Sequence, residues 1–420
     1  MVRETNKLAS GVIWNLIAFG VSASVGLCLN FGVARFFGPE VLGSFNWVFA
    51  AYIIASQLAA FGIHLSLVKH VGEVEHRERQ LEVMRSGMRA VLLPAFLFGI
   101  LFYGLSFLVE SVVPVEGVRR GMEVAAPSVT LFAFNKALLG CFNGMRAMRL
   151  YAVALMARAL GIAVSFVLIL VSGIDREYLP LVFLGGEIFA ALIAIGGAFV
   201  LKTPFWSRGA GDGVKRHWNF GLRALPGGLL AELNTRVDIL ILGMFVTDYS
   251  LGIYSFSALL AEGLYQVAVV LRSNVNPIIS REWASGSKMT LEQFICKGRF
   301  YGYAAGVPMC GVAVLLYPVV AKTIGGDAAF TEGWVPFAIL AGGLALISGY
   351  IPFSQVLLQT GSAFRNSVLV GIGVLANIIL NVLLIPVFGL IGAAAATAIS
   401  WVLSVIMLRV WVRRLNGIRF

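Results

Sequence analysis

Charged residues are scarce in this sequence, and that scarcity excludes an ordinary soluble domain. Asp, Glu, Lys and Arg make up 13% of the 420 residues, whereas hydrophobic residues make up 59% and the mean hydropathy is +0.88. In a typical soluble domain about a quarter of the positions are charged. A water-soluble core could not absorb so many apolar side chains. The sequence therefore predicts an integral membrane protein.

Signatures of several other protein classes are also missing. The four cysteines have neither the spacing of a zinc site nor that of a disulfide framework. There is no GxxxxGK[ST] motif, and no inner loop is long enough for a nucleotide-binding domain, so ATP is not expected to drive the chain directly. A nucleophile elbow and a zinc-binding helix are likewise absent. We therefore expect no metal, no cofactor and no enzyme activity.

Long apolar runs fill the chain almost from end to end. A helix that crosses the hydrocarbon of a membrane needs about 20 residues, and continuous runs exclude a β-barrel, whose strands alternate. The sequence predicts an all-α membrane protein with two pseudo-symmetric six-helix lobes, residues 1–201 and 218–420, joined by a cytoplasmic linker, 202–217, around a central cleft. The predicted spans are 8–33, 41–68, 86–109, 122–143, 151–171, 179–201, 220–245, 249–271, 300–320, 334–358, 368–387 and 390–412.

The distribution of Lys and Arg predicts the orientation of these spans. With the N-terminus in the cytoplasm, the inner segments and adjoining span ends hold 23 of these residues, and the outer segments hold five. Because positive residues resist translocation, both termini are expected to be cytoplasmic. The polar segment before the first span is too short for a cleaved signal peptide. The net charge of +11 then reflects this bias and contact with anionic lipids, and it needs no nucleic-acid partner.

A faint internal repeat relates the two predicted lobes. A shift of 209 residues superimposes four identical residues of the second and eighth spans and their flanks. The Leu-Gly pair ending at Gly43 falls on the pair ending at Gly252, and each pair opens a predicted helix. Two related six-helix bundles that face each other leave a cleft in which transporters hold substrate near the membrane midplane.

Both ends of the sequence resemble a known family. The segment Ala-Arg-Phe-Phe-Gly-Pro-Glu-Val-Leu-Gly at 34–43, with Trp-Asn at 14–15 and Phe-Gly-Ile at 61–63, is similar to polysaccharide flippases. So are residues 385–397, with Asn377 and Asn381 before them, and the Arg-Val-Asp at 236–238. These flippases are the O-antigen and capsule exporters of the multidrug/oligosaccharidyl-lipid/polysaccharide superfamily.

The resemblance implies a function and a location. It implies transfer of a polyprenyl-diphosphate-linked oligosaccharide from the inner to the outer leaflet of a prokaryotic cytoplasmic membrane, by alternating access. It also implies other polysaccharide-assembly membrane proteins as partners. A drug or metabolite antiporter of the same superfamily is the main alternative, and a membrane-embedded glycosyl- or acyltransferase is a weaker one.

Cations inside the predicted spans are candidate binding residues for the diphosphate. Lys136 and Arg158 each lie seven residues from an inner span end, about 10 Å deep at about 1.5 Å per residue. A charge at that depth costs several kcal/mol unless it faces protein or water, and the forked donors of arginine match phosphate. The predicted cationic cavity is completed by Arg223, which could instead snorkel to the inner surface, and by Arg236 and Arg35.

Carboxylates inside the spans are candidate coupling groups for an H+ or Na+ gradient. A carboxylate in a low-dielectric site can bind and release a proton as access alternates. The candidates are Glu232, Glu262, Asp238 and Glu187. Because Glu232 and Arg236 are four residues apart on one helix face, mutual neutralisation is the alternative interpretation of both.

Overall fold

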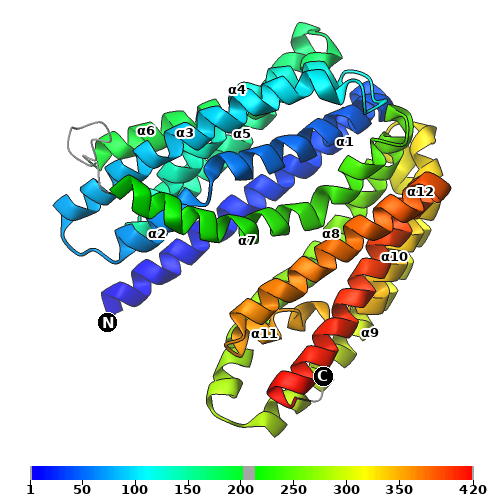
Figure 1. Cartoon of the computed structure of the whole chain (residues 1–420). Helices are drawn as coiled ribbons and strands as arrows, with labels where there is room; N and C mark the ends of the chain where they lie inside the picture. Colours follow the sequence, from blue (N-terminus) through cyan, green and yellow to red (C-terminus); the bar gives the residue numbers. More distant parts are fainter. Residues whose placement is uncertain (1, 202–212, 419–420) are drawn as a thin grey trace. The chain divides into compact units, whose positions relative to one another are not determined.

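The structure is a computed structural model that describes residues 2–201 and 213–418. Within these residues the chain forms twelve α-helices and no strand, which confirms the predicted all-α fold (Figure 1). The helices are α1 (Val2–Ala60), α2 (Ile63–Gly72), α3 (Arg77–Val109), α4 (Val118–Gly144), α5 (Met148–Ser172), α6 (Leu181–Val200), α7 (Gly213–Leu242), α8 (Asp248–Ala284), α9 (Lys288–Thr323), α10 (Trp334–Ile347), α11 (Val356–Gln359) and α12 (Ala363–Asn416). Three short 3-10 segments are η1 (Arg176–Tyr178), η2 (Ala328–Gly333) and η3 (Ile351–Phe353).

The two longest helices are each kinked at a glycine. Gly38 in α1 has φ 82° and Gly389 in α12 has φ 53°, so both lie in the left-handed region that glycine adopts without a steric penalty. The first kink lies between the predicted spans 8–33 and 41–68, and the second between 368–387 and 390–412. Helix α12 therefore carries two predicted spans, whereas α1 carries one and most of a second, which is interrupted at Phe61 and Gly62 and continues in α2.

The described residues form several helices of the length and apolar composition that a multi-span membrane protein needs. Nine of them are long and apolar enough to cross a membrane. Because α12 carries two spans and α1 carries one and most of another, these nine account for eleven of the predicted spans. The remaining one lies on α7, which has six Lys, Arg, Asp and Glu residues and is not among the nine.

The tenth predicted span is interrupted, which the apolar run at 334–358 did not reveal. Helix α10 ends at Ile347, and the chain passes through η3 before it resumes as α11. Pro352 within η3 has no backbone N–H to continue a helix. Gly349 packs so closely on α9 that a Cβ there would lie 2.5 Å from the Tyr303 ring. Close packing and a missing donor thus end the helix inside an apolar segment.

The chain folds into two compact units. Unit 1 comprises Met1–Gly32 and Ser44–Glu232, and unit 2 comprises Val33–Gly43 and Leu233–Phe420. Helices α1 and α7 each contribute residues to both units. The predicted lobes divide the chain elsewhere, before and after the linker at 202–217. Residues 202–212 of that linker lie outside the described residues, whereas 213–217 form the first turn of α7. The division into two functional lobes of six spans stays a prediction.

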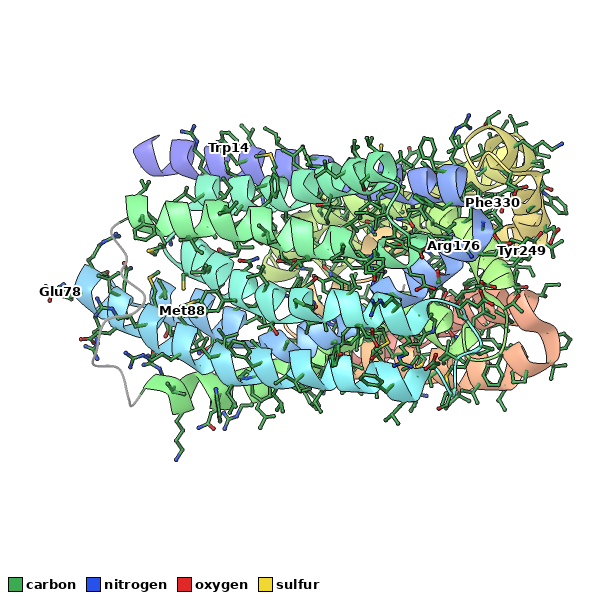
Figure 2. All side chains as sticks on the ribbon, turned by 90° about the horizontal axis from the view of Figure 1, so that it is seen from above. Trp14, Glu78, Met88, Arg176, Tyr249 and Phe330 are labelled. Atoms are coloured by element: carbon green, nitrogen blue, oxygen red, sulfur yellow. The ribbon has the colours of Figure 1, made fainter. Side chains whose placement is uncertain are left out.

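Aromatic stacking forms the centre of unit 1. The Phe183 ring stacks on Tyr52 at 4.8 Å and on Phe45 and Phe49 at 5.3 Å, measured between ring centroids. Figure 2 shows Glu78 near one end of the helices of unit 1 and Arg176 near the other. These two residues belong to segments that were predicted to lie on opposite sides of the membrane.

Unit 2 brings the two repeat-related glycines into direct contact. A Cβ on Gly43 would lie 2.2 Å from the carbonyl oxygen of Asp248 and 2.7 Å from the nitrogen of Gly252. A Cβ on Gly252 would approach the carbonyl carbon of Pro39 to 2.6 Å. Neither helix could come so close with a larger residue. The Leu-Gly pairs that the repeat aligned therefore mark the contact between α1 and α8.

Candidate functional site

Five helices of unit 1 direct polar side chains into one network. Close contact between α5 and α6 is the local reason that the network forms. A Cβ on Gly186 of α6 would lie 3.1 Å from the carbonyl oxygen of Arg158, and a Cβ on Gly161 of α5 would lie 2.8 Å from that of Gly185. Small residues at these positions let the two backbones approach. As a result Arg158 and the neighbouring Glu187 can meet.

An ion pair between Arg158 and Glu187 forms the first part of the network. The Arg158 Nε lies 2.7 Å from the Glu187 Oε1. Tyr52 donates its hydroxyl to the same oxygen at 3.2 Å, and Asn135 donates its Nδ2 to Oε2 and to the Glu187 carbonyl, both at 2.8 Å. The Glu187 side chain is 1% exposed and that of Arg158 is 26% exposed. The carboxylate is therefore buried with three donors, while the Arg158 side chain remains partly accessible.

Lys136 and Glu232 form the second part through a shared amide. The Lys136 Nζ donates to the Oε1 of Gln57 at 2.7 Å, and the Gln57 Nε2 donates to the Oε1 of Glu232 at 3.0 Å. Gln57 therefore connects a cation on α4 with a carboxylate on α7. Its amide is suited to this position because it offers an acceptor to the ammonium and a donor to the carboxylate.

Phe132 joins the two parts of the network. Its ring centroid lies 4.6 Å from the Arg158 guanidinium carbon and 5.1 Å from the Lys136 Nζ. Both distances are typical of cation–π contacts, in which the negative face of the ring attracts a cation. Two cations thus lie beside one aromatic ring, with two carboxylates as counter-ions. We refer to Arg158, Lys136, Glu187, Glu232 and Phe132, with Tyr52, Gln57 and Asn135, as the paired-charge network.

The structure brings together four of the nine predicted site residues: Lys136, Arg158, Glu187 and Glu232. The predicted division of roles, cations for substrate and carboxylates for coupling, stays a prediction, but each cation has a carboxylate within the same network. The four uncharged members were not predicted from the sequence. A polar or aromatic residue inside an apolar span, such as Asn135 beside Lys136, was the available signal.

The other predicted residues lie elsewhere. Asp238 belongs to unit 2, where its Oδ2 accepts the Tyr254 hydroxyl at 2.6 Å and its Oδ1 accepts the backbone N–H of Ile239 at 2.9 Å. Arg35, also in unit 2, is exposed and donates to the carbonyl of Thr323 at 2.9 Å. The remaining three are the exposed Arg223 on α7, the half-buried Arg236 on α7 and the exposed Glu262 on α8. Their predicted roles stay predictions.

The start of α7, which carries Glu232, is anchored to unit 1 by a buried histidine. His217 is fully buried, with its Nδ1 2.8 Å from the Ser66 Oγ and its Nε2 3.0 Å from the Ser86 Oγ. Because Ser86 donates its own proton to the Val83 carbonyl, it accepts from Nε2–H, and Ser66 donates to Nδ1. The next residue, Trp218, donates to the Ala90 carbonyl at 2.8 Å. This arrangement suits a neutral imidazole.

We expect the stability of the protein to fall below pH 6.5 because of His217, which precedes the predicted seventh span. Burial lowers the pKa of His217 from 6.5 to about 4, and repulsion by Arg216 and His70 acts in the same direction. The unfolded chain then binds a proton at a higher pH than the native protein. The stabilisation is complete above pH 6.5 and is lost as the pH falls towards 4, by up to about 3 kcal/mol.

Unfolding of the protein in detergent, measured between pH 7.5 and 4, tests this expectation. The His217→Gln variant should show a smaller loss of stability on acidification than the wild type, because its side chain does not titrate. The exposed His76 provides the matched control, and His76→Gln should retain the wild-type dependence. Equal pH dependence in all three proteins would contradict the role of His217.

Comparisons with known proteins agree with this architecture. The chain matches the family described as polysaccharide biosynthesis protein over residues 8–283. The probable low-salt glycan biosynthesis flippase Agl15 of Haloferax volcanii is 25% identical over 245 residues, which are 57% of this chain and 50% of that protein. An uncharacterized membrane protein of Methanocaldococcus jannaschii is 23% identical over 282 residues, 64% of this chain and 65% of that protein. The chain thus spans between half and just under two thirds of the curated relatives it matches.

Two groups of solved transporters share the fold. The lipid II flippase MurJ in its inward closed conformation superimposes with a TM-score of 0.72 at 16% identity, over 96% of this chain and 87% of that one. An inward-facing multidrug resistance MATE family transporter of the MOP superfamily gives 0.74 at 14% identity, over 94% of both chains. At these identities the likeness concerns the fold, which is that of MurJ and the MATE transporters.

Proposed function

The chain belongs to the polysaccharide biosynthesis protein family, and from this premise we propose that it is a flippase for a polyprenyl-diphosphate-linked oligosaccharide. It moves the glycan from the inner to the outer leaflet of the cytoplasmic membrane by alternating access, with both of its termini in the cytoplasm. The paired-charge network carries this proposal, because two cations from predicted spans lie beside one aromatic ring. The name of the relative from Haloferax volcanii is consistent with such a substrate.

Exchange of counter-ions is the proposed binding step. The Arg158 side chain is partly exposed, whereas that of Glu187 is buried. An incoming diphosphate therefore reaches the cation and can replace the carboxylate as its partner, since a forked guanidinium binds phosphate with two parallel hydrogen bonds. Lys136 supplies a second positive charge next to the same ring. The Phe132 face then keeps both cations in place while their partners change.

The same exchange gives the carboxylates a role in coupling. When the diphosphate takes the guanidinium, Glu187 keeps two hydrogen-bond donors and loses its counter-ion. Because an unpaired buried charge is costly, uptake of a proton or a sodium ion would neutralise it. Release of the substrate would return the guanidinium to Glu187 and expel the ion. Substrate and coupling ion thus bind to and leave the network together, with Glu232 and Lys136 acting in parallel.

We expect Lys136→Gln to slow flipping at least tenfold without loss of the folded protein. Lys136 donates its hydrogen bond to the neutral Gln57, so its replacement leaves no carboxylate without a direct hydrogen-bond partner, and the protein should fold. Loss of a charged contact to phosphate costs about 2–5 kcal/mol in binding. The measurement is the appearance of a lipid-diphosphate-linked oligosaccharide in the outer leaflet of proteoliposomes. Arg79→Gln, which removes an exposed cation from α3, is the matched control and should flip normally.

Three outcomes would overturn parts of the proposal. Normal flipping by Lys136→Gln would remove this lysine from the site. Export of a small cationic compound by wild-type protein that moves no lipid-linked glycan would favour the antiporter. Sugar or acyl transfer by the purified protein would favour an enzyme.

A further inference from the structure

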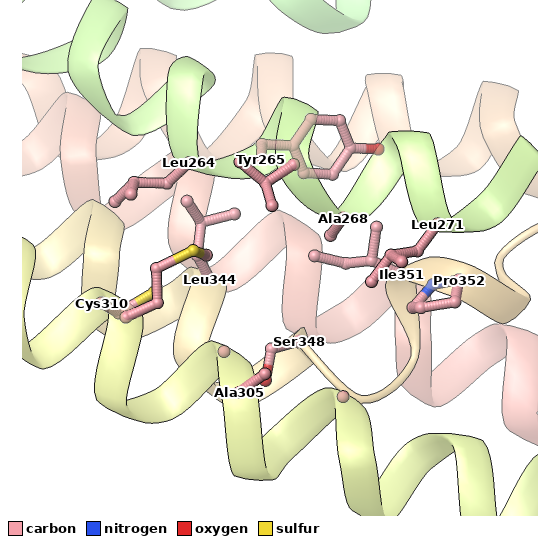
Figure 3. A pocket seen from close by; sticks show the side chains of 14 residues that line it. Leu264, Tyr265, Ala268, Leu271, Ala305, Cys310, Leu344, Ser348, Ile351 and Pro352 are labelled. Carbon is pink, nitrogen blue, oxygen red and sulfur yellow. The ribbon is translucent and has the colours of Figure 1, made fainter.

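An apolar groove runs along unit 2 where the tenth predicted span is interrupted. Residues from α8, α9, α10 and η3 line it (Figure 3). The face formed by α8 extends from Leu264 to Leu271, which is about 10 Å at about 1.5 Å per residue. Figure 3 shows Ala268, Ala305 and Pro352 among its walls. The groove is thus an elongated site for an apolar group rather than for a sugar.

Glycines and the broken helix together create this groove. A Cβ on Gly302 would lie 2.9 Å from the Cα of Gly349, and one on Gly306 would lie 2.4 Å from the Cβ of Ser348. These contacts hold α9 against the end of α10. The Tyr303 hydroxyl donates to the carbonyl of Leu346 at 2.9 Å and so satisfies one acceptor near the helix end. The missing helical turn after α10 leaves the space.

Two arginines lie at one end of the groove. Arg272 directly follows the lining residue Leu271, and its Nη1 lies 3.4 Å from the Ser354 Oγ. The Arg299 guanidinium lies 4.2 Å from the centroid of the Tyr350 ring, and its Nε is buried without a hydrogen-bond partner. Within residues 2–201 and 213–418, neither guanidinium is within ion-pairing distance of a carboxylate. This end of the groove therefore has positive charge available for an anion.

We propose that this groove binds the phosphate-proximal part of a polyprenyl phosphate lipid, with the phosphates at Arg272 and Arg299 and the first isoprene units along α8. The inference rests on the proposed function and adds a docking site for its substrate in unit 2. Charge complementarity orients the lipid, because the cationic end faces the inner leaflet in the orientation predicted from Lys and Arg. A single groove accommodates one chain, and a polyprenyl lipid has one chain below its phosphate, whereas a phospholipid has two.

Lipid binding to the purified full-length protein, followed by native mass spectrometry, tests the groove. The probe is a sugar-free polyprenyl diphosphate, compared with phosphatidylglycerol, with inorganic pyrophosphate and with the neutral polyprenol. Ala268→Phe fills the groove and should weaken binding of the probe at least tenfold. Val270→Phe is the matched control on the same helix, because Val270 is exposed and does not line the groove, and it should bind normally.

The cationic end is tested separately. The Arg272→Gln, Arg299→Gln double variant should lose at least tenfold in affinity for polyprenyl diphosphate and should bind the neutral polyprenol as the wild type does. Ala305→Phe replaces Ala268→Phe as the groove-filling variant if the latter does not fold. Unchanged probe binding in the groove-filling variant would overturn the inference. Preference of the wild type for phosphatidylglycerol would also overturn it and would assign the groove to a membrane phospholipid.

These experiments distinguish a wrong docking site from a wrong proposed function. If Ala268→Phe flips lipid-linked glycan at the wild-type rate, the function stands and the docking site does not. If the wild type binds the sugar-free probe in the groove but flips no lipid-linked glycan, the site stands and the function does not.

Discussion

Replacement of Arg158 by glutamine is expected to destabilise the protein by about 3–5 kcal/mol and to abolish flipping. The variant leaves the Glu187 carboxylate, 1% exposed, with the Tyr52 and Asn135 donors but without its cation. Removal of one partner of a buried ion pair has a cost of this size because the other charge remains buried. The free energy of unfolding in detergent measures the first effect, and transport in proteoliposomes measures the second.

A double variant separates these two effects. In Arg158→Gln, Glu187→Gln no charge of this pair remains, and the two amides can still form hydrogen bonds. Most of the lost stability should therefore return, since replacing both members of a buried pair by neutral groups is often close to neutral. Flipping should stay lost, because the diphosphate meets no guanidinium. Transport at the wild-type rate in the double variant would show that the pair serves the fold alone.

The sequence gives an expected depth for the intramembrane charges but not their partners. Counting residues from a span end places Lys136 and Arg158 at about 10 Å. Helical spacing, however, relates only residues of the same helix. Arg158 and Glu187 lie on different helices and meet because Gly186 lets α6 approach the Arg158 backbone. Such an approach depends on packing in three dimensions, which hydropathy and spacing do not contain.

Helix boundaries were predictable where polar residues or glycines coincide with the end of an apolar run. The kinks at Gly38 and Gly389 fall between predicted spans for this reason. The interruption after Ile347 was not predicted, because no charged residue follows it before the predicted span ends at Leu358. Pro352 alone was an ambiguous signal, since proline inside a span can also bend a continuous helix. The groove of unit 2 could not be inferred without this break.

Replacement of Gly252 by alanine is expected to lower the stability of the protein by about 3 kcal/mol, although alanine normally favours a helix over glycine by roughly 0.5–1 kcal/mol. The added Cβ meets the Pro39 backbone, which cannot rotate away as a side chain can. Gly263 on the same helix is the matched control, because a Cβ there has no atom within 4 Å. Gly263→Ala should be neutral or stabilising in the same unfolding measurement.

The contact between the two repeat-related glycines makes a further prediction about additivity. Gly43→Ala should cost about as much as Gly252→Ala, since its Cβ would meet the backbone of Asp248. The first added methyl group already separates α1 and α8, so the second meets a contact that is partly broken. The double variant should therefore lose clearly less stability than the sum of the losses in the two single variants. Additive losses would mean that the two glycines act independently. A shortfall would show that the two glycines, 209 residues apart in sequence, act through a single contact.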